Sequence, residues 1–204
     1  MVSQVRAHPW HGLPPRPEDS ECINAFIEIV PADEVKFELD KPSGLLRIDR
    51  PQQYSSRYPA LYGLIPRTYC GVRVGARSGE RIGVKDLKGD GDPMDVLVLT
   101  EAPVAHGGFL CRARPIGGVR MIDRDEADDK ILAVLEGDLA YGHFRDLADV
   151  PPALLERLRH YFLTYKQIPG DGAPKIRIAE TYDRAEALRM LQLSIEDYRE
   201  RFAG

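Results

Sequence analysis

Three carboxylates lie close together in the segment Lys88–Leu99, where Asp90, Asp92 and Asp95 stand on a glycine-containing turn before an apolar run. Carboxylates this close repel one another unless a cation lies among them or water screens them. Oxygen ligands alone suit hard cations such as Mg²⁺ or Mn²⁺ better than zinc. The segment therefore indicates a divalent-metal site, and a solvated Asp-Gly turn before a strand is the alternative.

A second acidic group, Asp123–Lys130, follows the apolar run Gly118–Ile122 and includes Asp123 and Asp128. A charged turn between strands explains such a group equally well when it stands alone. Two hard cations, however, need several carboxylates that converge from different segments. Two acidic groups in one modest chain therefore favour a shared site.

Charged residues on the early β-type runs fit the same site. Lys36 and Glu38 are two residues apart and therefore share one face of a strand, while Glu28 and Arg50 lie on neighbouring runs. Each of them alone could be an ordinary surface charge. If these faces turn toward the acidic groups, metals would lie among the carboxylates and the basic side chains could hold an anion, which points to a phosphate substrate.

The elements that must position these residues are mostly short strands with turn residues between them, which predicts an antiparallel barrel or sandwich. Alternating or apolar runs predict strands over residues 23–30, 35–39, 45–49, 94–99, 109–114, 131–135 and 175–179. Apolar residues at helical spacing predict helices over about 153–166 and 184–202. Asp183, with Glu186 three residues on, is a plausible N-cap pair for the second helix.

We expect one domain over residues 1–204, with mainly β structure and packed helices (α+β). The proline-rich residues 1–20 show no periodicity and indicate an extended N-terminal arm. Residues 63–89 are rich in glycine and basic side chains, and the runs around Gly75–Gly79 suggest an inserted hairpin. This segment is either a solvated excursion, a basic flap beside the acidic groups, or an oligomer contact.

Composition excludes several classes of function. The 204 residues are 43% hydrophobic, 8% aromatic and carry a formal net charge of −4, which argues against a nucleic-acid or anionic-membrane surface. The start of the chain lacks the apolar core of a signal peptide, and no stretch approaches the length of a membrane span. The three cysteines do not form a disulfide or zinc pattern. We expect a cytoplasmic protein with no nucleic-acid or membrane partner.

The order of these motifs resembles that of the family-I soluble inorganic pyrophosphatases. The family signature, Asp-x-Asp-Pro-x-Asp before an aliphatic run, reads Asp90-Gly-Asp-Pro-Met-Asp95 here. Five further motifs follow the family order between residues 22 and 166, in segments 26–38, 43–50, 58–63, 121–130 and 160–166. The resemblance implies a five-stranded barrel of the oligonucleotide/oligosaccharide-binding (OB) type with two α-helices from the C-terminal half packed outside.

The resemblance also implies an activity, the metal-dependent hydrolysis of inorganic pyrophosphate to two orthophosphates. Asp90, Asp95 and Asp128 would bind the tighter activating cations, Mg²⁺ or another divalent ion such as Mn²⁺, and Asp123 would help to hold one that arrives with the substrate. Asp92 would be the general base for a metal-activated water. Bridging cations offset the repulsion between pyrophosphate and the attacking hydroxide and acidify bound water.

Basic and phenolic side chains would hold the phosphoryl groups. By the resemblance, the clamp is formed by Lys36, Arg50, Tyr62, Tyr165 and Lys166. The supporting residues in the same cavity would be Glu28, Glu38, Tyr58 and Lys130. From spacing alone, the tyrosines could equally be core residues with solvated hydroxyls. Compact bacterial relatives are hexamers and eukaryotic ones dimers, so we expect a homo-oligomer of one of these kinds.

Two alternatives remain open from the residues. A haloacid-dehalogenase-type phosphatase also uses an Asp-x-Asp core, but its apolar strand precedes the first aspartate, whereas Val96–Leu99 follows it here. A non-enzymatic OB-type binding module is the other alternative, because barrels of this kind often bind nucleic acid. The many carboxylates argue against it.

Overall fold

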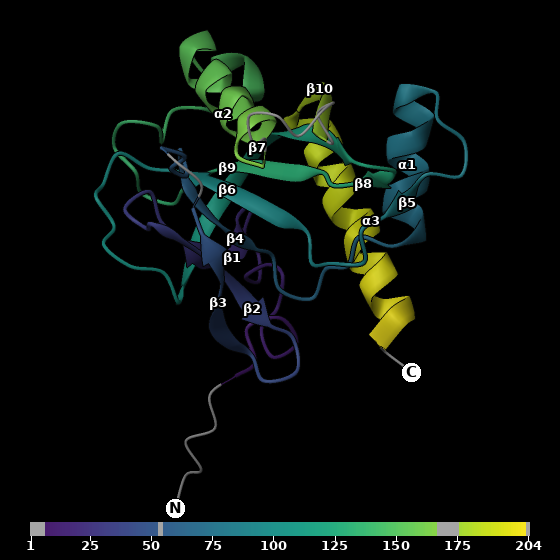
Figure 1. Cartoon of the computed structure of the whole chain (residues 1–204), viewed down its shortest axis with the longest axis horizontal. Helices are drawn as coiled ribbons and strands as arrows, with labels where there is room; N and C mark the ends of the chain where they lie inside the picture. The colour runs from purple at the N-terminus through teal and green to yellow at the C-terminus, as the bar shows by residue number, and fades with distance from the viewer. Residues whose placement is uncertain (1–6, 53–54, 167–175, 203–204) are drawn as a thin grey trace, which may run out of the picture.

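The computed structural model describes residues 7–52, 55–166 and 176–202 (Figure 1). Within these ranges the strands are β1 (Ile23–Ile29), β2 (Val35–Asp40), β3 (Leu45–Pro51), β4 (Leu61–Leu64), β5 (Lys88–Gly89), β6 (Asp95–Leu99), β7 (Phe109–Asp123), β8 (Glu126–Ala127), β9 (Lys130–Leu135) and β10 (Ile176–Asp183). The helices are α1 (Val72–Ile82), α2 (Pro152–Thr164) and α3 (Arg184–Phe202), with a 3₁₀ turn η1 at Leu147–Asp149.

Five strands form a closed barrel. They pair in the order β1–β4–β6–β9–β7, and β7 pairs again with β1 to complete the ring. The pairs are antiparallel except β6–β9, which is parallel. This closed ring confirms the predicted OB-type α+β fold. It differs from the open parallel sheet that a haloacid-dehalogenase-type phosphatase requires.

Three short additions extend the barrel. β8 and β10 both pair with the end of the long strand β7 at Ile122 and Asp123, β10 continues along β7 to Gly117, and β5 pairs in parallel with β8. β2 and β3 form a two-stranded ribbon of their own beside the barrel (Figure 1). The predicted strands are all present, although β7 and β10 run well beyond the runs expected from the sequence.

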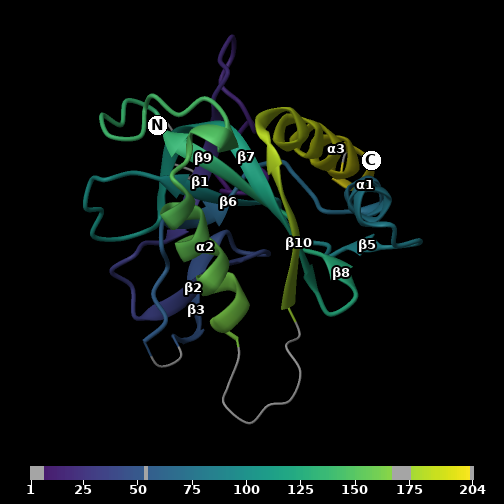
Figure 2. The ribbon, with the colours of Figure 1, turned by 90° about the horizontal axis from the view of Figure 1, so that it is seen from above.

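Alternate side chains of the barrel strands feed two cores, as the two-residue period of a strand requires. On β6, Val96 and Val98 join a core that includes Met190 of α3, whereas Leu97 and Leu99 join a core that includes α2. β10 contacts both α2 and α3 and lies between them in Figure 2. The barrel is therefore held between two helices that approach it from different sides.

Both predicted C-terminal helices are confirmed. α2 starts with Pro152 in its first turn, where the missing N–H of proline costs nothing. α3 begins at Arg184, and the Asp183 carboxylate accepts a 2.9 Å hydrogen bond from the backbone N–H of Glu186. The expected N-cap is therefore present.

The hairpin expected within residues 63–89 is wrong, because Val72–Ile82 forms helix α1. The glycines Gly71, Gly75, Gly79 and Gly83 recur every fourth residue, which is close to the helical period. A Cβ at Gly75 would lie 2.5 Å from the carbonyl oxygen of Leu87, so glycine lets the helix approach that backbone closely.

Residues 7–20 of the predicted N-terminal arm contain no helix or strand and pack against the barrel; residues 1–6 lie outside the described part. Trp10 is buried beside Phe26, Leu39 and Leu64, and its ring N–H donates to the carbonyl of Thr68 at 2.8 Å. The arm therefore contributes to the core. In the part of the chain that the structure describes, no helix combines the length and apolarity needed to cross a bilayer.

Candidate active site

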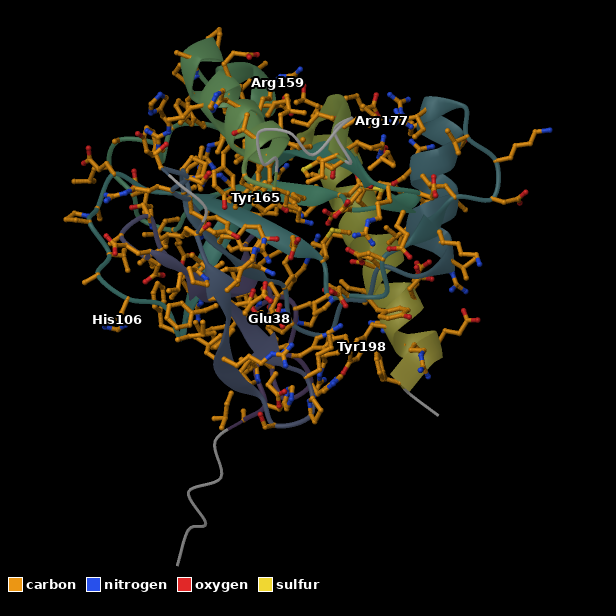
Figure 3. The ribbon with its side chains drawn as sticks, viewed as in Figure 1. Glu38, His106, Arg159, Tyr165, Arg177 and Tyr198 are labelled. Carbon is orange, nitrogen blue, oxygen red and sulfur yellow. The ribbon has the colours of Figure 1, made fainter. Side chains whose placement is uncertain are left out.

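A cavity of about 560 Å³ opens between the barrel, the β2–β3 ribbon and the end of α2. All fourteen residues that the sequence singled out line it: Glu28, Lys36, Glu38, Arg50, Tyr58, Tyr62, Asp90, Asp92, Asp95, Asp123, Asp128, Lys130, Tyr165 and Lys166. Figure 3 shows two of its walls, with Glu38 on the ribbon and Tyr165 at the end of α2. Segments that are far apart in the sequence therefore meet in one place.

The acidic wall comes from three segments that end or begin at the barrel. Asp95 opens β6 and Lys130 opens β9, and the parallel register places these two residues side by side. The Lys130 ammonium contacts Asp95 at 2.6 Å and Asp128 at 2.8 Å. Asp90 lies on the turn before β6 and accepts a 2.9 Å hydrogen bond from the N–H of Asp92. We call Asp90, Asp95, Asp128 and Lys130 the cavity cluster.

The carboxylates of this wall are short of positive charge. Burial raises the pKa of Asp90 to about 8, with repulsion from Asp128 and Asp95 as further causes. Burial also raises the pKa of Asp128, against the attraction of Lys130. The pKa of Glu28 is raised to about 8 by burial and then by Asp95, although its carboxylate accepts a 2.6 Å hydrogen bond from the Leu39 N–H.

This donor set fits a hard divalent cation. The donors are carboxylates, and burial and repulsion between carboxylates raise the pKa of two of them, Asp90 and Asp128. A cation among them removes both penalties. Among the described residues, no three Asp, Glu, His or Cys side chains already stand as a ligand set. Lysines neutralise the aspartates instead: Lys130 as above, Lys41 at Asp92 and Lys166 at Asp123.

The basic wall is set by the register of the β2–β3 ribbon. Lys36 lies opposite Arg50, and Glu38 lies opposite Arg47. Lys36 contacts Asp49 at 3.0 Å and Glu38 at 3.3 Å, so its ammonium is held over the cavity by two carboxylates. The ribbon thus presents fixed positive charge that faces the acidic wall.

An aromatic stack carries phenolic hydroxyls along the cavity. Ring centroids lie 5.0 Å apart for Tyr58–Tyr62, 4.7 Å for Tyr58–Tyr161 and 5.0 Å for Tyr161–Tyr165. The Tyr62 hydroxyl donates to Asp95. Burial raises the pKa of Tyr62 and Tyr58 well above the usual value and that of Tyr165 to about 12, so these phenols remain protonated hydrogen-bond donors.

Sequence reasoning missed several charged residues that line the cavity, among them Lys41, Arg47 and Glu126. Lys41 forms an ion pair with Asp92 across the cavity mouth. A signal for it was available, because Lys41 lies on the turn between the two predicted strands that carry Lys36 and Arg50. If the charged face of the two strands turns toward the cavity, the turn that joins them, and Lys41 on it, is carried to the same place.

A closed barrel whose mouth joins clustered carboxylates to lysines, arginines and tyrosine hydroxyls is typical of a class of proteins, the hydrolases of phosphate anhydrides or esters. Comparison with known proteins gives the family. The model of the inorganic pyrophosphatase family matches residues 25–199, and the chain belongs to that family.

Relatives and solved structures agree with this assignment. An inorganic pyrophosphatase of Chlamydia trachomatis serovar L2 is 50% identical over 94% of this chain and 94% of its own length. A soluble inorganic pyrophosphatase of Oryza sativa subsp. indica is 40% identical over 95% of this chain and 80% of its own. The crystal structure of the Thermus thermophilus inorganic pyrophosphatase superposes with a TM-score of 0.78 at 27% identity, over 95% of this chain and 99% of that one.

Proposed function

We propose that this cavity hydrolyses inorganic pyrophosphate to two orthophosphates, with divalent cations held by Asp90, Asp95, Asp123 and Asp128. Family membership supports the reaction. The observation that supports the residue assignments is that every residue singled out by its type and spacing or by the family resemblance lines one cavity. Neither a nucleic-acid-binding module nor a different phosphatase fold explains that convergence together with the family match.

The proposed chemistry is the transfer of a phosphoryl group to water. Cations bound by the aspartates supply charge neutralisation and acidify water. Asp92 accepts the proton that the attacking water loses as its oxygen bonds to one phosphorus. The bond from that phosphorus to the bridging oxygen breaks, and the bridging oxygen leaves with the second orthophosphate. Lys41, which forms an ion pair with Asp92, keeps that carboxylate at the cavity mouth.

The basic and phenolic walls have separate roles in the proposal. Lys36, Arg50 and Lys166 neutralise the charge that develops on the leaving phosphate. Tyr165 donates a hydrogen bond to a phosphoryl oxygen without adding charge, and Tyr62 does so by turning its single hydroxyl proton away from Asp95 when a cation takes that carboxylate. Their raised pKa values keep both phenols protonated. Four further residues support this arrangement from the lining of the same cavity: Glu28, Glu38, Tyr58 and Lys130.

Finer features of the proposal concern the cation and the assembly. We propose Mg²⁺ as the working cation, with Mn²⁺ as a substitute, because the donor set contains only oxygen. A homo-oligomer, hexamer or dimer, in the cytoplasm stays a prediction. So does the organisation of residues 1–204 as a single domain.

The test is orthophosphate release from pyrophosphate with and without Mg²⁺, in the natural protein and in Asp92→Asn. We expect Mg²⁺-dependent turnover, and a loss of kcat of about 10²–10⁴-fold in Asp92→Asn, the usual range for removal of a general acid or base. The control is Asp125→Asn, which changes an exposed aspartate outside the cavity. Turnover like that of the natural protein in a folded Asp92→Asn variant would refute the assigned role.

A further inference from the structure

A second charge cluster lies behind the cavity, on the other side of the segment that carries Asp128. Arg120 has a side chain with no exposed surface, and it forms ion pairs with Asp129 at 3.2 Å, with Glu186 at 2.8 Å and with Glu180. The hydroxyl of Ser78 donates to the other oxygen of Asp129. We call Ser78, Arg120, Asp129, Glu180 and Glu186 the rear network.

Asp129 connects the rear network to the cavity through the backbone. It is preceded by Asp128 and followed by Lys130, and both of these side chains belong to the cavity cluster. The Asp129 side chain points the opposite way, toward α1 and β7. Any force that fixes Asp129 therefore fixes the backbone on which Asp128 and Lys130 stand.

Helix α1 contacts both acidic segments, one through a side chain and the other through its backbone. Its residue Ser78 holds Asp129, next to Asp128, and its residue Gly75 packs so closely that a Cβ there would lie 2.6 Å from the N atom of Gly89, next to Asp90. The two segments also pair with each other as β5 and β8. Both views show β5 and β8 beside α1 (Figures 1 and 2).

The helix itself is firmly anchored. Asp197 of α3, 4% exposed, accepts hydrogen bonds from the backbone N–H groups of Gly71 at 3.1 Å, Arg73 at 3.0 Å and Val74 at 3.1 Å. These are donors that the first turn of a helix leaves without partners, so the carboxylate of one helix caps the other. The first turn of α1 is thus fixed to α3.

We infer that helix α1 is a positioning element for the proposed metal site, and that Ser78 is its positioning residue, acting through Asp129 on Asp128. The inference rests on the proposed function, because it assumes that Asp128 binds the cation. A hydroxyl–carboxylate contact at this point sets the distance between the Asp90 turn and the Asp128 segment, as outer partners of metal ligands do. A purely structural role would change stability without changing the affinity for metal.

The experiment is calorimetric titration of the whole protein with Mg²⁺ alone, without substrate. We expect Ser78→Ala to weaken Mg²⁺ binding about 3–10-fold, below the range for direct partners of ligands because Ser78 acts one step further away. The matched control is Ser194→Ala on α3, a serine equally buried that donates to its own helix at Leu191 and should leave the affinity unchanged.

A double-mutant cycle tests the route through Asp129. Ser78→Ala combined with Asp129→Asn should weaken Mg²⁺ binding no more than the stronger single variant, because both remove the same link. Ser78→Cys fills nearly the same space with a weak donor and keeps the test open if the alanine variant does not fold. Unchanged Mg²⁺ affinity in a folded Ser78 variant, or full additivity, would overturn the inference alone, whereas no Mg²⁺ binding by the natural protein would overturn the proposed function with it.

Discussion

The cavity cluster and the rear network lie on opposite sides of the segment Asp128–Lys130, and they differ in the balance of negative and positive charge. In the rear network the three carboxylates of Asp129, Glu180 and Glu186 meet the guanidinium of Arg120. Two arginines of α1 outside that network add positive charge, because Arg77 pairs with Glu186 and Arg81 pairs with Glu180. In the cavity cluster the single ammonium of Lys130 pairs with Asp95 and Asp128, and among the described residues Asp90 forms no ion pair.

The pKa values follow this difference in part, because burial also raises the pKa of Asp129 in the rear network to about 6, against the attraction of Arg120. Burial works against Glu186, yet hydrogen bonds from Arg77 and Arg120 lower its pKa. Burial and repulsion between carboxylates instead raise the pKa of Asp90 to about 8. A balanced cluster holds the fold together, while a cluster with surplus negative charge is suited to accept cations. The same residue types serve two purposes according to the number of partners each finds.

The largest effect is expected when the central basic side chain of each cluster is replaced. Arg120→Met leaves three buried or half-buried carboxylates short of a partner and should lower the free energy of unfolding by about 3–5 kcal/mol. Lys130→Met should cost a similar amount in EDTA. Its deficit relative to the natural protein should shrink in Mg²⁺, because the freed Asp95 and Asp128 can then bind the cation.

Urea unfolding with EDTA and with excess Mg²⁺ measures both variants. If the two clusters differ as described, Mg²⁺ reduces the loss of unfolding free energy in Lys130→Met and leaves that loss unchanged in Arg120→Met. Equal recovery of stability by the two variants in Mg²⁺ would contradict the difference between the clusters.

A smaller effect concerns the pH dependence of the metal-free protein. Glu28 has a folded-state pKa of about 8, above its ordinary value of 4.5, so its contribution is fully present below pH 4.5 and is lost as pH rises through 8. Glu28→Gln keeps an acceptor for the Leu39 N–H but cannot ionise. In EDTA it should therefore be more stable than the natural protein at pH 9, by at most about 5 kcal/mol, since the pKa rises from 4.5 to about 8 and each pKa unit corresponds to about 1.4 kcal/mol.

Unfolding curves at pH 4, 7 and 9 check this prediction. The gain should disappear near pH 4, below the ordinary pKa of 4.5, where both states of the natural protein largely carry the proton at position 28. A difference that does not change with pH would show that Glu28 is not held neutral by its surroundings.

The smallest expected effect separates the anion clamp from the metal ligands. Lys166→Ala should raise KM for pyrophosphate about tenfold, the loss of one charge-assisted contact, while Mg²⁺ affinity changes less than twofold. The Lys166 ammonium lies 2.6 Å from Asp123 and is 39% exposed, so its removal frees a carboxylate without leaving a buried charge. Lys85→Ala, on the exposed turn after α1, is the control. Equal losses of substrate and metal binding would contradict the clamp.

Much of the site could be read from residue types at short range. Asp90, Asp92 and Asp95 are close in sequence and must remain close in space, and Lys36 and Glu38 share a strand face by the two-residue period. Lys41 and the helix α1 were missed for another reason. The position of Lys41 depends on how the β2–β3 ribbon is oriented relative to the barrel. The four-residue glycine spacing indicates a helix face without side chains, and its role is visible only once another backbone segment packs against that face.

By itself the sequence determined the strand runs, the two C-terminal helices and the identity of the charged groups, because these follow from local periodicity and side-chain chemistry. Only the tertiary structure decided which carboxylates have partners. Asp128 and Asp129 are neighbours of the same type, yet one faces the cavity and the other meets Arg120 and Ser78. The reason is that charge balance is a property of all the segments that meet around a group, and chain folding alone brings those segments together.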